Sequence, residues 1–178
     1  MKFYLLQQMN KLKQNNAFSI FELTVVLAII AITTTLVLSL SINNNEHLII
    51  AEAHLLRSTI WHLQQRCRAE NKNLALVFNE QENFYTTPNE KHKLSARVKF
   101  GTIQDALGPP SSPKKRLKKS ITFKNKQIKI SPHGIAQAGT VYLVDDKKQL
   151  LYAITVPISG VTFIRMYRYR NKQWHVYT

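Results

Sequence analysis

The sequence has one cysteine and none of the short motifs that mark common catalytic or nucleotide sites. A single thiol, Cys67, excludes an intramolecular disulfide, and its place in a helical pattern favours an unpaired cysteine on a helix face. The chain lacks a Walker loop, a GxGxxG fingerprint, an HExxH pair and a CxxC pair. We therefore expect neither an enzyme nor a protein with a metal or other cofactor.

Acidic residues are also scarce. The chain has 10 Asp and Glu against 25 Lys and Arg, which gives a formal net charge of +15. Such an excess favours anionic partners, namely nucleic acid, anionic lipid headgroups or acidic proteins.

The longest apolar stretch lies near the N-terminus. Leu23 to Ile42 contains no charged residue, no proline and no glycine. As a helix these residues would span about 30 Å, the thickness of the hydrocarbon core of a bilayer. One carboxylate, Glu22, directly precedes this stretch, and a charge at that depth calls for a partner. A secretory signal peptide, a plain membrane anchor and a leader cleaved in front of the helix all remain open.

The residues around Glu22 favour the cleaved leader. Ala17-Phe18-Ser19-Ile20-Phe21-Glu22-Leu23 resembles the processing motif of type IV prepilins and pseudopilins, with Ala where the family usually has Gly. The resemblance implies cleavage by a prepilin peptidase between Ala17 and Phe18, followed by N-methylation of Phe18. It also implies that Glu22 forms an assembly salt bridge with the new amine of a neighbouring subunit.

The basic residues of the leader indicate a topology. Lys2, Lys11 and Lys13 precede the apolar stretch without an acidic residue among them. The positive-inside rule then predicts a single-pass membrane protein with a cytoplasmic N-terminus and its C-terminal domain on the other side. The resemblance implies that the membrane is the inner membrane, that this domain is periplasmic or extracellular, and that the protein later enters a filament.

The helical pattern continues beyond the apolar stretch. Apolar residues recur every three or four positions as far as about Glu70, so the second half of the helix is predicted to be amphipathic. We expect an α+β fold in which one long N-terminal helix, transmembrane in its first half, packs on a C-terminal antiparallel sheet domain. The predicted segments are a leader (1–17), a transmembrane or filament-core helix (18–42), its amphipathic continuation (43–70) and a β-domain (71–178).

After residue 73 the pattern changes to period two with short polar turns, which predicts antiparallel hairpins. The expected strands are Leu74–Phe78, Phe84–Thr86, Ala96–Phe100, Ile121–Phe123, Gln127–Ser131, Thr140–Val144, Leu150–Val156, Val161–Tyr169 and Trp174–Tyr177. Gly108 to Lys119 is the one clear loop, and Gly134 and Gly139 are expected turn positions. Gln64–Ala69, Ile130–Gly134 and Ala138–Leu143 resemble the minor pseudopilin H and FimT-like branch of the pilin family.

Two basic stretches are candidates for binding nucleic acid or another anion. The first lies in the expected loop and the second near the C-terminus, where cations alternate with aromatic residues; a final hairpin with a solvated face would give the same alternation. The FimT-like Gly-Arg-x-Arg motif is replaced here by Ser159-Gly160-Val161-Thr162. The candidate cations are Lys114, Lys115, Arg116, Lys118, Lys119, Arg165, Arg168 and Arg170.

Three histidines, His47, His54 and His62, could share one helical stripe. Without a second type of ligand nearby, solvent-facing or interface roles are favoured over a metal site.

The resemblance therefore implies a minor pilin or pseudopilin of a type II secretion or type IV pilus-like filament. Its expected partners are other subunits, the prepilin peptidase and the inner-membrane assembly platform. The alternative is a DNA-binding minor pilin that acts in DNA uptake or adhesion.

Overall fold

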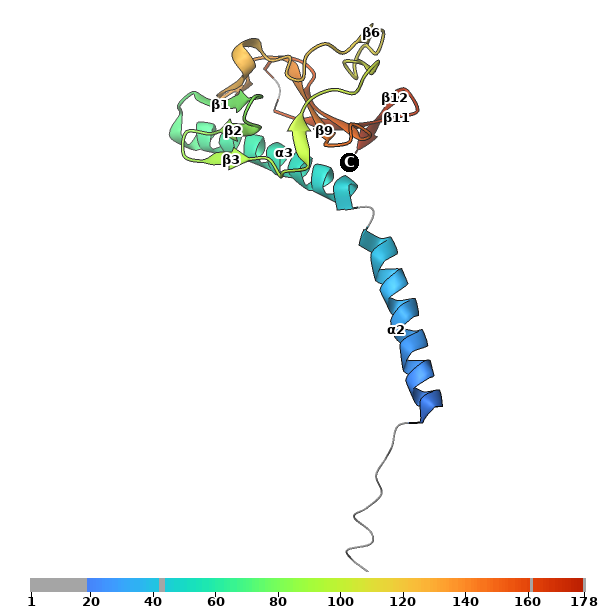
Figure 1. The fold of residues 1–178 in the computed structure, drawn as a ribbon. Helices are drawn as coiled ribbons and strands as arrows, with labels where there is room; N and C mark the ends of the chain where they lie inside the picture. The colour runs from blue at the N-terminus through green and yellow to red at the C-terminus, as the bar shows by residue number, and fades with distance from the viewer. Residues whose placement is uncertain (1–18, 42–43, 161, 178) are drawn as a thin grey trace, which may run out of the picture. The chain divides into compact units, whose positions relative to one another are not determined.

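The computed structural model describes residues 19–41, 44–160 and 162–177, with the backbone alone for 36–41 and 44. The chain divides into two units, Met1–Ile42 and Asn43–Thr178 (Figure 1). The first contains helix α2 (Ile20–Ser41), and the second contains helix α3 (Asn44–Glu70) and all the strands.

The prediction of one long helix on one sheet domain is wrong. Among the residues it describes, the structure has two α-helices and three sheets, and the helices are separate elements on either side of positions 42–43. The run Asn43-Asn44-Asn45 gives a physical reason, because asparagine side chains compete for backbone hydrogen bonds and favour helix caps over helix interiors.

The predicted localisation is also contradicted. Within the part of the chain that the structure describes, no helix has both the length and the apolar character needed to cross a membrane. This finding opposes the expected single-pass inner-membrane protein and the transmembrane first half of the helix.

Two antiparallel sheets form most of the second unit. One has the order β3-β2-β1-β7-β8 and the other β12-β11-β10-β9-β4, while β5 and β6 form a two-stranded hairpin. The strands are β1 (Leu74–Asn79), β2 (Phe84–Thr86), β3 (Lys91–Lys93), β4 (Val98–Phe100), β5 (Leu107–Gly108), β6 (Lys115–Arg116), β7 (Gln127–Ser131), β8 (Gly134–Ile135), β9 (Gly139–Asp145), β10 (Leu151–Val156), β11 (Arg165–Arg170) and β12 (Gln173–Tyr177). A short 3₁₀ turn, η1 (Lys124–Lys126), precedes β7.

Helix α3 packs against both five-stranded sheets. Its buried stripe, which includes Ile49, Leu56 and Ile60, shares one core with residues of both sheets, among them Leu76 of β1 and Ile154 of β10. The helix thus covers one face of both sheets (Figure 1). Of the residues in the expected three-to-four spacing, Leu56, Ile60, Leu63 and Cys67 are buried, whereas Leu55 lies on the exposed side.

A second, smaller core lies on the opposite face of the β9–β10 sheet. It contains Ala106 from the segment before β5, together with Tyr142, Val144, Leu151 and Ala153 from the two central strands. Leu117, from the Gly108–Lys119 segment that was expected to be a loop, packs against the same core.

The two glycines expected at turns differ from each other. Gly134 has the left-handed φ (140°) expected of a turn glycine. At Gly139 the Phe123 ring packs directly against the backbone, and a Cβ added there would lie 2.5 Å from this ring.

Two buried tyrosines predict a decrease in stability at alkaline pH. Burial disfavours the phenolate and raises the pKa of both Tyr142 and Tyr152 to about 12. Their folded-state pKa values lie above the unfolded value, so their stabilising contribution is complete below pH 10 and is lost as pH rises from about 10 to 12.

We expect Tyr152→Phe to be more stable than the parent at pH 11, because this variant has no phenol to ionise. At pH 7 the two should differ by less than about 1 kcal/mol, since the buried Tyr152 hydroxyl has no hydrogen-bond partner among the described residues. Urea unfolding at both pH values measures the difference. If the free energy of unfolding fell equally between pH 7 and pH 11 in the two proteins, the raised pKa of Tyr152 would be contradicted.

Candidate functional site

The N-terminus of α2 is closed by a reciprocal pair of hydrogen bonds. The Ser19 hydroxyl accepts from the Phe21 amide at 3.2 Å, and a Glu22 carboxylate oxygen accepts from the Ser19 amide at 3.1 Å. This Ser-x-x-Glu arrangement is a capping box, which satisfies amides that have no partner inside the helix. Glu22, predicted to pair with a neighbouring subunit, therefore also caps its own helix. Ala17 and Phe18 lie outside the described residues.

From Ile20 to Thr35, where its side chains are described, α2 presents a largely apolar surface. Its threonine hydroxyls donate to carbonyls of the preceding turn, as Thr33 does to Ile29 (2.9 Å) and Thr34 to Ile30 (2.6 Å), so their polar atoms are satisfied within the helix. The exposed large apolar side chains are Ile20, Phe21, Leu23, Val25, Val26, Leu27, Ile29, Ile30 and Ile32. A contiguous apolar surface of this kind marks an interaction site.

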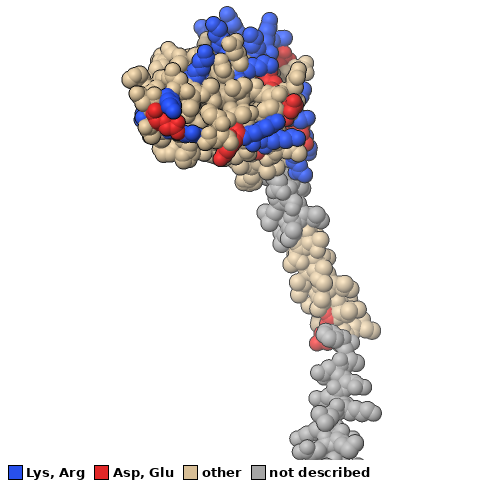
Figure 2. Space-filling model, turned by 90° about the vertical axis from the view of Figure 1, so that its left-hand side faces the viewer, with Lys and Arg blue, Asp and Glu red and all other residues tan. Residues whose placement is uncertain are grey.

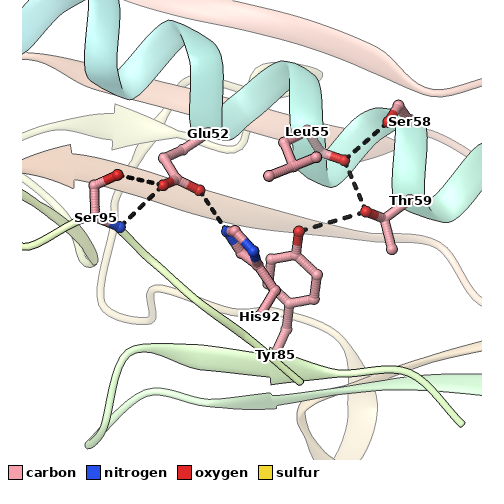
Figure 3. Close-up of polar contacts among 7 residues, drawn as sticks. All are labelled: Glu52, Leu55, Ser58, Thr59, Tyr85, His92 and Ser95. Carbon is pink, nitrogen blue, oxygen red and sulfur yellow. Dashed lines mark hydrogen bonds and ion pairs between the residues drawn. The ribbon is translucent and has the colours of Figure 1, made fainter. Parts of the chain in front are cut away.

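Glu52 of α3 is a buried carboxylate whose side chain points from the helix toward Ser95 and His92 (Figure 3). One oxygen accepts from both the amide (2.9 Å) and the hydroxyl (2.5 Å) of Ser95. The other oxygen lies 3.0 Å from Nε2 of His92. Beside it the Tyr85 hydroxyl lies 3.4 Å from the Thr59 hydroxyl, and the ring centroids of Tyr85 and His92 are 4.9 Å apart.

This group ties α3 to the segment of β3 and β4. The Ser95 hydroxyl donates to the carboxylate and not to the imidazole, so Ser95 and His92 form no nucleophile–base pair in this arrangement. What the geometry provides is an anchor in which one buried carboxylate satisfies three donors when His92 carries its proton on Nε2. The anchor was not predicted from the sequence, although an acidic residue in the apolar stripe of α3 was the signal.

The cations of the first basic stretch are exposed around the β5–β6 hairpin. Lys114, Lys115, Arg116, Lys118 and Lys119 all have exposed side chains. Arg116 forms an ion pair with Asp105 at 3.2 Å. All five predicted cations of this stretch are therefore exposed to solvent on one continuous segment.

The arginines of the second stretch do not form one surface. Strand alternation places Arg168 on the same face of β11 as the buried Met166, and Arg168 forms an ion pair with Glu46 of α3 at 2.7 Å. Arg165 lies on the opposite face, with its guanidinium 5.3 Å from the Phe163 ring centroid. Arg170 is exposed at the end of the hairpin.

The aromatic residues of this second stretch hold the first one in place. The Tyr169 hydroxyl accepts from the Leu107 amide at 3.2 Å, and Trp174 Nε1 donates to the Leu107 carbonyl at 2.6 Å. Leu117 packs against the same small core as these two rings. The alternation of cations and aromatics thus reflects packing of the β5–β6 hairpin on the sheet, which sequence alone did not distinguish from base stacking.

No group of three metal-ligating side chains occurs within the described ranges, and His47, His54 and His62 are all exposed on α3.

Three features of the described chain stand out as candidates for function: the capped apolar helix α2, the anchored carboxylate Glu52, and the cations around the β5–β6 hairpin. Glu22 caps α2, and Glu52 bonds α3 to the segment between β3 and β4. The cations around the hairpin are exposed to solvent. Searches of protein-family models, curated proteins and solved structures found no match to this chain.

Proposed function

We propose that this chain is a minor subunit of a filament of the type IV pilus or type II secretion class. It is cleaved by a prepilin peptidase between Ala17 and Phe18, N-methylated at Phe18, and assembled through α2. The observation that carries the proposal is α2 itself, an apolar helix with a carboxylate in its first turn and its large side chains exposed.

The exposed side chains supply the driving force for assembly. Covering one large aliphatic or aromatic side chain contributes about 1.5–3 kcal/mol. Nine such residues between Ile20 and Ile32 are exposed, so packing against the α2 helices of other subunits would be strongly favourable. The hydroxyls of Thr33 and Thr34 already donate within their own helix, so they need no partner at such an interface.

The second unit supports a subunit with a folded head. Residues 44–177 contain their own core, in which α3 packs on both sheets, so this unit does not depend on α2 for its buried surface. Cleavage before Phe18 would leave α2 and the second unit intact.

The test is the mass of the chain's N-terminus when it is produced together with a prepilin peptidase. We expect a chain that starts at Phe18 and is heavier by one methyl group, about 14 Da. Ala17→Leu should remain unprocessed, because a bulky residue replaces the small one at the cleavage site, whereas Asn16→Leu should be processed normally. Ala17→Gly should be cleaved at least as completely as the parent. A parent chain that still starts at Met1 would contradict the proposal.

A further inference from the structure

The strongest feature outside the proposed assembly helix is a groove lined by lysines. It has a volume of about 560 Å³ and lies between the segment after β6 and the turn η1. Lys118 and Lys119 line it from one segment, and Lys124 and Lys126 line it from the other. The hydroxyl and amide groups in its lining belong to Ser120, Thr122 and Asn125.

The segment that carries the lysines has charge of one sign. Residues 114–126 contain seven Lys and Arg and no Asp or Glu. Figure 2 shows Lys and Arg side chains gathered at the upper end of the second unit, where Figure 1 has β6. Within the described residues only two of the seven cations form ion pairs, Arg116 with Asp105 and Lys126 with Glu80 at 2.5 Å. The other five have no ion-pair partner among the described residues and remain available to an anionic ligand.

The one carboxylate in the groove is already satisfied. Glu80 pairs with Lys126 and accepts from the Ser120 hydroxyl. Burial opposes its ionisation, yet these two hydrogen bonds hold the pKa of Glu80 below its ordinary value, so it stays ionised and bound to its neighbours near neutral pH. It does not compete for the other lysines.

The groove is also held in a fixed shape. The Leu117 amide donates to the Ala106 carbonyl at 2.8 Å, and the Tyr142 amide donates to the Ser120 carbonyl at 2.8 Å. The Thr122 amide donates to the Thr140 carbonyl at 2.9 Å. These bonds fasten the lysine-bearing segment to β9 and to the residues before β5. Preorganised cations lose less conformational freedom when an anion binds.

We propose that this groove binds the sugar–phosphate backbone of nucleic acid without sequence preference. Ammonium and hydroxyl groups suit phosphate oxygens, and dense phosphate charge is what such a row of lysines neutralises best. A concave site fits a strand of phosphates better than a flat layer of lipid headgroups. No large apolar side chain between residues 98 and 157 is exposed, so this part of the described surface offers no large apolar group to insert into a lipid layer. This proposal is independent of the filament proposal.

The test compares two triple variants of the full chain, kept dispersed in non-ionic detergent because of its apolar helix. Lys118→Gln, Lys119→Gln and Lys124→Gln together remove unpaired cations of the groove. Lys93→Gln, Lys99→Gln and Lys147→Gln remove the same charge from exposed positions that do not line it. Binding of a fluorescent duplex of about 30 bp is measured by anisotropy between about 50 and 200 mM salt.

We expect the parent to bind at micromolar concentration at the lower salt, and the groove variant to bind at least roughly tenfold more weakly. The slope of log affinity against log salt should become shallower by about one unit for each lysine that no longer neutralises a phosphate, about three in all. The control variant should keep most of the affinity. Absence of binding by the parent, or equal weakening in both variants, would overturn the proposal. Anionic vesicles that bind through the three lysines while the duplex does not would overturn it in favour of lipid.

Discussion

Replacing Glu52 by alanine is expected to lower the free energy of unfolding of the second unit by about 3 kcal/mol. The change removes an acceptor that is 6 % exposed and leaves the Ser95 amide, the Ser95 hydroxyl and the His92 ring without their partner. Ser95 and His92 are half-buried, so donors that lose this acceptor recover hydrogen bonds to water only in part. Urea denaturation followed by circular dichroism at pH 7 measures the change as a lower midpoint at an unchanged slope.

Two further variants separate the anchor from a general effect of removing a glutamate. Glu52→Gln keeps an oxygen that can accept from Ser95 and should cost about half as much stability. Glu90→Ala changes an exposed side chain in the turn before β3 and should stay within about 0.5 kcal/mol of the parent. If Glu52→Ala were as stable as Glu90→Ala, the carboxylate would not anchor α3.

Local periodicity predicted the elements that have strong local patterns. The buried stripe of α3 follows the helical spacing from Ile49 to Cys67, and β2 and β7 occupy the residues expected for them. Each of these elements buries one face against the core, so its apolar residues repeat with the period of the element. The antiparallel hairpins β9–β10 and β11–β12 follow from the same alternation and from their short polar turns.

Partners that come from distant positions could not be predicted in this way. Glu52 meets Ser95 forty-three residues later, and Leu107 meets Trp174 sixty-seven residues later. The strand β3 has the sequence Lys-His-Lys, without an apolar residue that could identify it as a strand. Its position is fixed by pairing with β2. Such pairings depend on the order of strands in the sheets, which no local pattern contains.

The basic stretches show how the same residues can be interpreted in two ways. Arg168 belongs to a run of cations in the sequence, yet the fold pairs it with Glu46 on α3. Tyr169 and Trp174 alternate with cations in the sequence, a pattern that also suits base stacking, yet their polar atoms bind the backbone of Leu107. Sequence composition identified the excess of charge, and only the fold shows which cations remain exposed.

A second large effect is expected at the start of α2, where Glu22 has two separable roles. As the N3 residue of a capping box it accepts from the Ser19 amide, and in the proposed filament it would neutralise the N-terminal amine of a neighbouring subunit. Glu22→Ala removes both roles. Glu22→Gln keeps an acceptor for the cap, since glutamine also serves at this position, but removes the charge.

We therefore expect Glu22→Ala and Glu22→Gln alike to fall at least roughly tenfold in co-purification with other filament subunits, while both are still cleaved before Phe18. An apolar interface makes the decrease large, because the neighbouring amine would be left without a counter-charge. Ser19→Ala is the reciprocal control: it removes the hydroxyl that accepts from Phe21, costs the helix about 1 kcal/mol, and keeps the charge, so it should still assemble. Normal incorporation of Glu22→Gln would assign Glu22 to helix capping alone and remove the inter-subunit salt bridge from the proposal.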